Sequence, residues 1–144
     1  MSKIVVDASV AIKWVVEEDG TAQALVLLKH AGLVAPDLLI AECANILWKK
    51  VRRSELTKED ALLAARLFER TDVEFLPTRA LLEPAARIAI ELDHPAYDCV
   101  YLALAAANDW KFVTADEPFV RKVRENRRTH LHSVVIPLSE APEA

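Results

Sequence analysis

The sequence predicts an α/β domain with a mainly parallel β-sheet. Short runs rich in β-branched and apolar residues alternate with longer helical segments along nearly the whole chain. Strands that pair in parallel need crossover connections between them, and helices usually supply these. Of the 144 residues, 53% are hydrophobic and only 2 are glycine, which favours one compact, helix-rich domain over a disordered chain.

Turn and capping residues set the boundaries of the elements predicted in the first half of the chain. Gly20 separates two apolar runs, Thr21 is a candidate N-cap, and Gly32 is a candidate stop signal. Asp37 follows a strand and caps a long helix, while Thr57, with an acid three residues later, forms a loose capping box. The predicted elements are strands over 3–6 and 33–36 and helices over 8–18, 21–31, 37–53 and 57–70.

Two prolines mark helix starts in the second half of the chain. Pro84 comes early enough to be tolerated in a first turn, and Pro95 stands at the start of the next helix. The predicted elements are strands over 73–77, 111–115 and 132–138 and helices over 80–93, 95–109 and 117–126. We see no linker-like segment, so we expect a single domain over residues 1–139 and a short C-terminal tail over residues 140–144.

Hydropathy and cysteine usage predict a cytoplasmic protein without a membrane span. The longest apolar runs, such as 101–107, are far shorter than the roughly 20 residues that span a bilayer. The N-terminus has one basic residue and only a few apolar residues before Asp7, which does not fit a secretory signal. Cys43 and Cys99 lie in apolar helical runs, as buried free thiols do in a reducing compartment.

Four acidic residues stand where a parallel sheet brings loops together. Asp7 ends the first predicted strand, Asp116 directly follows the fourth, and Glu42 and Asp98 lie in the early turns of two helices. Loops that leave the carboxyl ends of parallel strands share one edge, where ligands bind. Glu42 and Asp98 also interrupt apolar helices, where an unpaired carboxylate is costly to bury. We expect all four side chains to reach the same edge.

Converging carboxylates imply a bound cation. Two carboxylates 4 Å apart repel each other by roughly 4 kcal/mol at an effective dielectric constant near 20. An all-oxygen donor set favours a hard ion, Mg²⁺ or Mn²⁺, over zinc. Such a site suits phosphodiester hydrolysis, since a metal activates water and stabilises the developing charge. Ser9 and Thr114, adjacent to the acids, are candidates for supporting polar residues, and Asn45 shares a helix face with Glu42.

Each acid also has a plainer structural interpretation. Asp7 and Asp116 are placed to cap the helices that follow them, Asp98 to complement a helix dipole, and Glu42 to pair with a basic residue. The joint placement of the four favours the metal site. The histidines are interpreted as ordinary polar or capping residues: His30, His94, His130 and His132.

Four stretches together resemble the PIN-domain ribonucleases, and specifically the VapC-type toxins of bacterial and archaeal toxin–antitoxin pairs: VVDASV, ECANIL, YDCVYLALA and FVTADEPF. Each stretch is weakly specific alone, but their order and spacing are highly specific, and the resemblance covers nearly the whole chain. It implies a three-layer α/β/α sandwich and Mg²⁺- or Mn²⁺-dependent endoribonuclease activity.

The resemblance also implies roles for individual residues and partners. The acidic quartet is Asp7, Glu42, Asp98 and Asp116, with Asp7 and Asp98 as the direct metal ligands. Ser9, Asn45 and Thr114 fall where the family often has supporting polar residues. The implied substrate is RNA, and the implied assembly is a homodimer inhibited by a VapB-like antitoxin that masks the acidic pocket.

The charge distribution bears on an RNA substrate. The net charge of −4 and the pI near 5.6 argue at first sight against a nucleic-acid partner. Basic residues are nevertheless bunched at 49–53 and 121–128, and these, with Lys13, are candidates for phosphate contacts. Trp14 and Trp48 fit packing or interface roles better than base stacking.

Other protein classes fit the sequence less well. A haloacid-dehalogenase-like phosphatase needs an acid two residues after the first aspartate, where this chain has Ser9. A receiver domain needs an aspartate at the end of the third strand, and VEFLPT has none. Two alternatives stay open: a catalytically silent PIN-like binding module, and a PIN nuclease that processes RNA without being a toxin. Metal titration separates the silent module from the enzyme.

Overall fold

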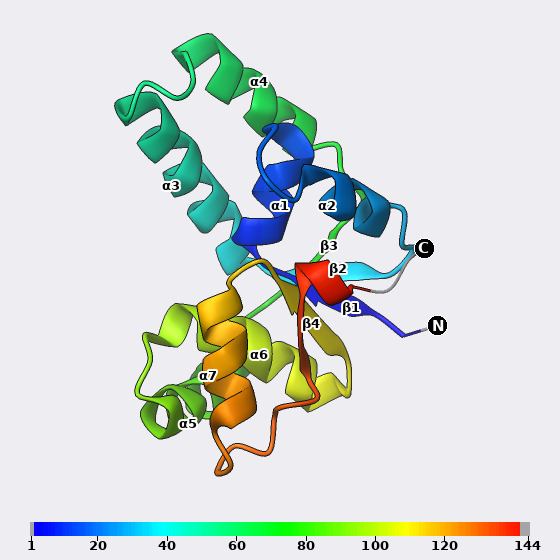
Figure 1. The fold of residues 1–144 in the computed structure, drawn as a ribbon, viewed down its shortest axis with the longest axis vertical. Helices are drawn as coiled ribbons and strands as arrows, with labels where there is room; N and C mark the ends of the chain where they lie inside the picture. Colours follow the sequence, from blue (N-terminus) through cyan, green and yellow to red (C-terminus); the bar gives the residue numbers. More distant parts are fainter. Residues whose placement is uncertain (1, 142–144) are drawn as a thin grey trace.

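The computed structural model describes residues 2–141 (Figure 1), so residues 142–144 of the predicted tail lie outside the described part. Five strands form one sheet in the order β3-β2-β1-β4-β5, and every neighbouring pair is parallel. The strands are β1 (Ile4–Val6), β2 (Leu33–Pro36), β3 (Glu74–Leu76), β4 (Lys111–Thr114) and β5 (Val135–Pro137).

Helices cover both faces of the sheet, which confirms the predicted three-layer α/β/α sandwich. They are α1 (Ala8–Val15), α2 (Thr21–Leu28), α3 (Leu38–Arg52), α4 (Lys58–Phe68), α5 (Leu82–Leu92), α6 (Ala96–Asn108) and α7 (Glu117–Glu125), with short 3₁₀ turns at η1 (Arg79–Leu81) and η2 (Leu138–Glu140). In Figure 1, α1 to α4 lie on one face and α5 to α7 on the other, and the α3–α4 hairpin extends beyond the sheet. Within residues 2–141, no helix is long and apolar enough to cross a membrane.

The strand order creates one natural place for a ligand. From β1 the chain moves outward through β2 and β3, and it then returns to the other side of β1 to form β4 and β5. The order therefore reverses between β1 and β4, and open α/β sheets bind ligands at the carboxyl ends of the strands beside such a reversal. Asp7 directly follows β1, and Asp116 lies two residues beyond β4.

Aromatic side chains fill the core on both sides of the sheet. Tyr101 of α6 stacks on Phe112 of β4 with ring centroids 5.6 Å apart, and Phe119 of α7 meets Phe112 edge-on. On the opposite face, Trp14 stacks on Phe68 and is buried, as predicted. These rings fix α6 and α7 beneath the two central strands.

The loop after α1 departs from the prediction. The helix ends at Val15 instead of at residue 18, and the N-cap of α2 is Gly20, not Thr21. The Thr21 hydroxyl instead accepts a hydrogen bond from the Glu18 backbone N–H at 3.0 Å and donates to the Val16 carbonyl. Gly20 has φ of +89°, a conformation that residues with a Cβ adopt at a cost. Local side-chain bonds thus replace the last turn of the expected helix.

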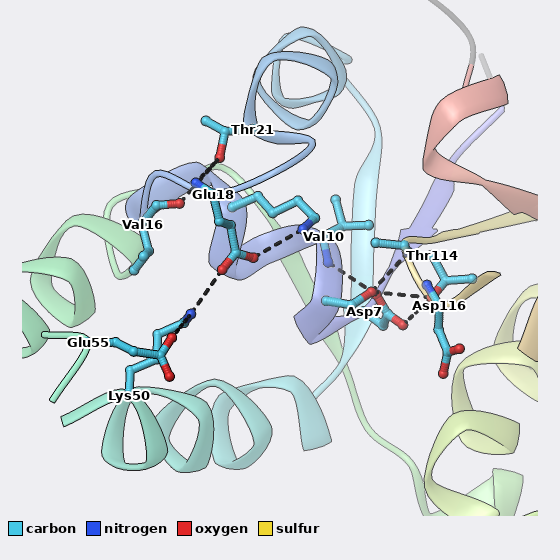
Figure 2. A network of polar contacts seen from close by, with 12 residues as sticks. Asp7, Val10, Val16, Glu18, Thr21, Lys50, Glu55, Thr114 and Asp116 are labelled. Atoms are coloured by element: carbon cyan, nitrogen blue, oxygen red, sulfur yellow. Dashed lines mark hydrogen bonds and ion pairs between the residues drawn. The ribbon is translucent and has the colours of Figure 1, made fainter. Parts of the chain in front are cut away.

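This loop places Glu18 between two ammonium groups. Its carboxylate contacts Lys13 of α1 at 3.1 Å and Lys50 of α3 at 2.9 Å (Figure 2). Burial on its own raises the pKa of Glu18, but the two lysines outweigh it and hold the pKa below its ordinary 4.5. Lys13, a candidate phosphate contact, is therefore part of an internal ion-pair network that joins α1 to α3.

We predict that Glu18→Gln lowers the free energy of unfolding by about 1 to 3 kcal/mol, because both lysines lose a charged partner in a partly buried position. The measurement is urea unfolding at neutral pH. Glu83→Gln is the matched control, since the Glu83 side chain is 65% exposed and its one ion pair among the described residues is with Arg87, one helical turn away, an arrangement worth about 0.3 to 0.5 kcal/mol. Equal losses in the two variants would contradict a structural role for the Glu18 network.

Candidate metal-binding and catalytic site

Asp7 occupies the end of β1 and caps α1. It is only 5% exposed, and its Oδ1 accepts hydrogen bonds from the Ser9 hydroxyl at 2.6 Å and the Val10 backbone N–H at 3.3 Å. Its Oδ2 accepts a hydrogen bond from the Thr114 hydroxyl at 2.6 Å, across from β1 to β4 (Figure 2). The plainer interpretation of Asp7 as an N-cap is thus confirmed, and the same carboxylate also faces the sheet edge.

Burial makes this carboxylate electrostatically unusual. Loss of hydration raises the pKa of Asp7 from 3.8 to about 7, although the hydrogen bonds from Ser9, Thr114 and Val10 act in the opposite direction. The negative charge of Asp98 adds to the increase. A buried carboxylate of this kind is stabilised either by a proton or by a nearby cation.

Asp116 caps α7 just beyond β4. Its Oδ1 accepts a hydrogen bond from the Phe119 backbone N–H at 3.1 Å, and its own backbone N–H donates to the Thr114 hydroxyl at 3.1 Å. The adjacent Ala115 N–H donates to the Ser9 hydroxyl at 3.0 Å. The hydroxyls of Ser9 and the fully buried Thr114 therefore tie the ends of β1 and β4 together and orient Asp7 between them.

Glu42 reaches the same edge from α3. It accepts a hydrogen bond from the hydroxyl of Tyr101, which rises from α6 on the opposite face of the sheet. Burial raises the pKa of Glu42, the hydrogen bond from Tyr101 counteracts this, and the charge of Asp98 adds to it. Burial also raises the pKa of Tyr101, so the phenol remains a proton donor at any physiological pH.

Asp98 is held by a histidine that sequence reasoning did not connect to the site. His94 Nε2 lies 2.8 Å from Asp98 Oδ2, four residues further on. The imidazole packs against Phe119 with ring centroids 4.8 Å apart. Its Nδ1 faces the Lys122 ammonium at 3.5 Å, and that ammonium also donates to the Asp93 carbonyl. Because an ammonium only donates hydrogen bonds, this arrangement favours the tautomer in which Nε2–H points at Asp98.

The four carboxylates line one pocket of about 250 Å³ at the reversal of strand order. The remaining lining residues are Ala8, Ser9, Asn45, Ile46 and Lys49. The structure thus brings together all four acids selected from the sequence, together with Ser9 and Asn45, while Thr114 supports Asp7 from behind. His94 and Tyr101 were not predicted to be parts of the site, and Lys49 was predicted only as a candidate phosphate contact. The spacing of His94 and Asp98 was an available signal, because residues four apart on a helix face each other.

The donor chemistry fits a hard divalent cation, because carboxylate, amide and hydroxyl oxygens surround the pocket. Within residues 2–141, however, no three Asp, Glu, His or Cys side chains are grouped closely enough to hold a metal ion. Each carboxylate instead has its own protein donor: Ser9 and Thr114 for Asp7, Tyr101 for Glu42, His94 for Asp98 and the start of α7 for Asp116. The four acids therefore line the same pocket and repel one another, but they are not close enough together to form a complete set of metal ligands.

The two cysteines take no part in this chemistry. Cys43 and Cys99 are free and buried, as predicted. Burial raises the pKa of Cys43 to about 12 and that of Cys99 to about 11. Both thiols therefore stay protonated at neutral pH and are poor metal ligands and nucleophiles.

Comparison with known proteins is consistent with this geometry. The PIN domain family model matches residues 4–125. Ribonuclease VapC9 of Mycobacterium tuberculosis is 35% identical over 113 residues, which cover 78% of this chain and 85% of that protein.

Two solved structures share the fold. The crystal structure of PAE2754 from Pyrobaculum aerophilum superposes with a TM-score of 0.72 and 23% identity, covering 96% of this chain and 85% of that chain. The structure of VapBC2 from Rickettsia felis, bound to a DNA fragment from the promoter, gives a TM-score of 0.64 and 15% identity over 93% of this chain and 97% of that chain.

We predict that Asp7→Asn makes the stability of the metal-free protein less dependent on pH between pH 5 and 8. The folded protein binds a proton at Asp7 up to a pH of about 7 and the unfolded chain only to about 3.8. The proton on Asp7 therefore contributes its full stabilisation of the fold below pH 3.8. This contribution, about 4 kcal/mol at most, is lost as the pH rises to about 7. Thermal melting in EDTA between pH 5 and 8 should show a smaller decline for Asp7→Asn than for wild type. If the melting temperatures of wild type and Asp7→Asn fell equally with pH, burial would not be what raises the pKa of Asp7.

Proposed function

The chain belongs to the PIN domain family, and we propose that it is a divalent-metal-dependent endoribonuclease, the toxin of a VapBC-type toxin–antitoxin pair. The observation that carries the proposal is the single pocket lined by Asp7, Glu42, Asp98 and Asp116 where the strand order reverses. The 35% identity to VapC ribonucleases over most of the chain supports it.

The acidic pocket would hold Mg²⁺ or Mn²⁺, with Asp7 and Asp98 as the direct ligands and Glu42 and Asp116 beside them. A bound ion supplies positive charge at the scissile phosphate and lowers the pKa of a water molecule. Ser9 and Thr114 orient the two oxygens of Asp7, and His94 orients Asp98, so these two carboxylates would be available to hold such an ion. Asn45 contributes an amide at the pocket wall.

The reaction is hydrolysis of an RNA phosphodiester. The oxygen of water forms a bond to phosphorus, one bond between phosphorus and a ribose oxygen breaks, and that oxygen leaves with a proton. An open pocket at the sheet edge suits an endonuclease, because a continuous strand can cross it without threading an end.

The proposed partner is a VapB-like antitoxin, and the proposed assembly is a homodimer. Support for the antitoxin comes from homology to VapC ribonucleases and from the VapBC2 complex among the structural neighbours. A toxin of this kind requires inhibition in the cell, and covering the acidic pocket is the direct way to achieve it.

The central test is cleavage of RNA by the purified protein. We predict metal-dependent cleavage by wild type with Mg²⁺ or Mn²⁺, no cleavage in EDTA, and at least about 100-fold slower cleavage by Asp7→Asn and Asp98→Asn, because each loses a charged ligand. Structured tRNA should be included among the substrates, and Glu83→Gln serves as a surface control. If wild type and the aspartate variants behave alike, the protein is not a nuclease of this kind.

The toxin role has its own test. We predict that expression of wild type without a partner arrests growth and that expression of Asp7→Asn does not, because only the former would degrade RNA. The measurement is colony formation after induction, with protein levels matched by immunoblot. An active nuclease that leaves growth unaffected would assign the protein to RNA processing rather than to a toxin–antitoxin pair.

The hydrogen bond between His94 and Asp98 predicts an effect on metal affinity. His94→Ala should weaken Mn²⁺ binding by about 10- to 100-fold, as removal of a ligand-orienting partner typically does. His94→Gln should recover most of the affinity, because its amide N–H can replace Nε2–H. Mn²⁺ titration followed by electron paramagnetic resonance measures this without catalysis. Equal affinities for wild type and His94→Ala would contradict an orienting role.

A further inference from the structure

A second hollow adjoins the acidic pocket at the C-terminal end of α3. It has a volume of about 350 Å³ and is lined by three cationic side chains, Lys49, Arg52 and Arg53. All three residues are exposed, and none of them forms an ion pair within residues 2–141. Lys50, in the same basic run, instead turns toward Glu18 and Glu55. The run is thus divided between one structural lysine and three cations that face a common hollow.

The hollow lies next to the acidic pocket and shares one lining residue with it. Lys49 lines both. Helical spacing explains the connection, because Glu42, Asn45, Lys49 and Arg52 follow one another at intervals of three, four and three residues and therefore share one face of α3. At 1.5 Å per residue this stripe is about 15 Å long. It runs from a carboxylate at the proposed reaction centre, past an amide, to the cations.

An exposed aromatic ring borders the cationic end of the stripe. Trp48 is 54% exposed, so of the predicted packing or interface role only the interface alternative fits the described chain. The Arg52 guanidinium lies 5.4 Å from the centroid of its ring, within the range of a cation–π contact. Proteins that hold single-stranded nucleic acid combine cationic side chains for phosphates with aromatic faces for bases.

The helix dipole alone does not account for this arrangement. Cations in the last turn of a helix are favourable wherever they point around the axis. Here three cations converge on one hollow, and like charges three and four residues apart on a helix repel each other. An anion in the hollow relieves that repulsion.

We propose that Lys49, Arg52 and Arg53 form a phosphate-binding subsite for a single-stranded segment of RNA whose scissile linkage lies in the acidic pocket. The RNA strand follows the polar face of α3. Its phosphates contact the three cations, and one of its bases lies within reach of the Trp48 ring. The inference rests on the proposed nuclease function and gives the direction in which the bound RNA strand extends from the acidic pocket.

The test compares two triple variants that remove the same charge. One is Lys49→Ala/Arg52→Ala/Arg53→Ala, and the control is Arg121→Ala/Arg127→Ala/Arg128→Ala, from the other exposed basic run. Fluorescence anisotropy with a labelled single-stranded RNA of 12 nucleotides, in EDTA to prevent cleavage, gives the dissociation constant at several salt concentrations. We expect the α3 variant to bind at least about 10-fold more weakly and its salt slope to fall by about 2, since each phosphate contact to a single strand contributes about 0.7.

The outcomes separate the subsite from the function on which it rests. Circular dichroism melting first establishes that both variants fold. If wild type cleaves RNA with Mn²⁺ but the α3 variant binds and cleaves like wild type, the subsite is overturned while the nuclease stands. Equal weakening in both variants also overturns it, because general charge then explains binding. Loss of antitoxin binding without loss of RNA binding would reassign the surface to a protein partner. If wild type neither binds nor cleaves any RNA, the proposed function itself has failed.

Discussion

The buried carboxylate of Asp7 is the constraint on which the arrangement of the site depends. It directly follows the central strand and caps the first helix. It also accepts hydrogen bonds from the hydroxyl of Ser9 in α1 and the hydroxyl of Thr114 at the end of β4. Each of these bonds stabilises the fold, yet burial raises the pKa of the group to about 7. A neutral asparagine could cap α1 through its one acceptor oxygen without the cost of a buried charge, although it would lose the second acceptor that Thr114 uses. The presence of an acid is therefore better explained by something that binds it than by capping alone.

The other three acids show how a fold can hold carboxylates close together although they repel one another. Each carboxylate is held by a donor from a different element: Tyr101 reaches Glu42 from the opposite face of the sheet, His94 holds Asp98 from the end of α5, and the first turn of α7 holds Asp116. These donors keep the acids apart while they share one pocket. The same contacts offset part of the electrostatic cost that a cation would remove more completely.

The mainly parallel sheet could be predicted from the alternation of strand and helix patterns, and the three layers from the resemblance to PIN-domain ribonucleases. The four acids were selected from their positions at strand ends and in apolar helices, and the structure places them around one pocket. Asp7 and Asp116 follow directly from the rule that parallel strands present their carboxyl ends at one edge, whereas Glu42 and Asp98 were selected because they interrupt apolar helices. The partners of the acids were harder to predict. Tyr101 meets Glu42 across 59 positions in sequence, a contact that only the packing of two layers creates. The loop at Glu18 was also mispredicted, because two hydrogen bonds of the Thr21 hydroxyl and two ion pairs of Glu18 outweigh helix propensity there.

A single face of helix α3 carries opposite charges at its two ends. Its early turns contribute the acid and amide of the pocket, and its last turns contribute cations, so the sign of charge changes along the helix from Glu42 to Arg52. A polyanionic strand is repelled by the uncompensated acids, and it is attracted by the cations two turns away. Binding at the cationic end therefore does not require the acids to be neutralised first, whereas binding at the acidic end does. Under the proposed function, this separation would let the cationic end of α3 hold the RNA strand while the acidic pocket accepts a phosphate only together with a metal ion.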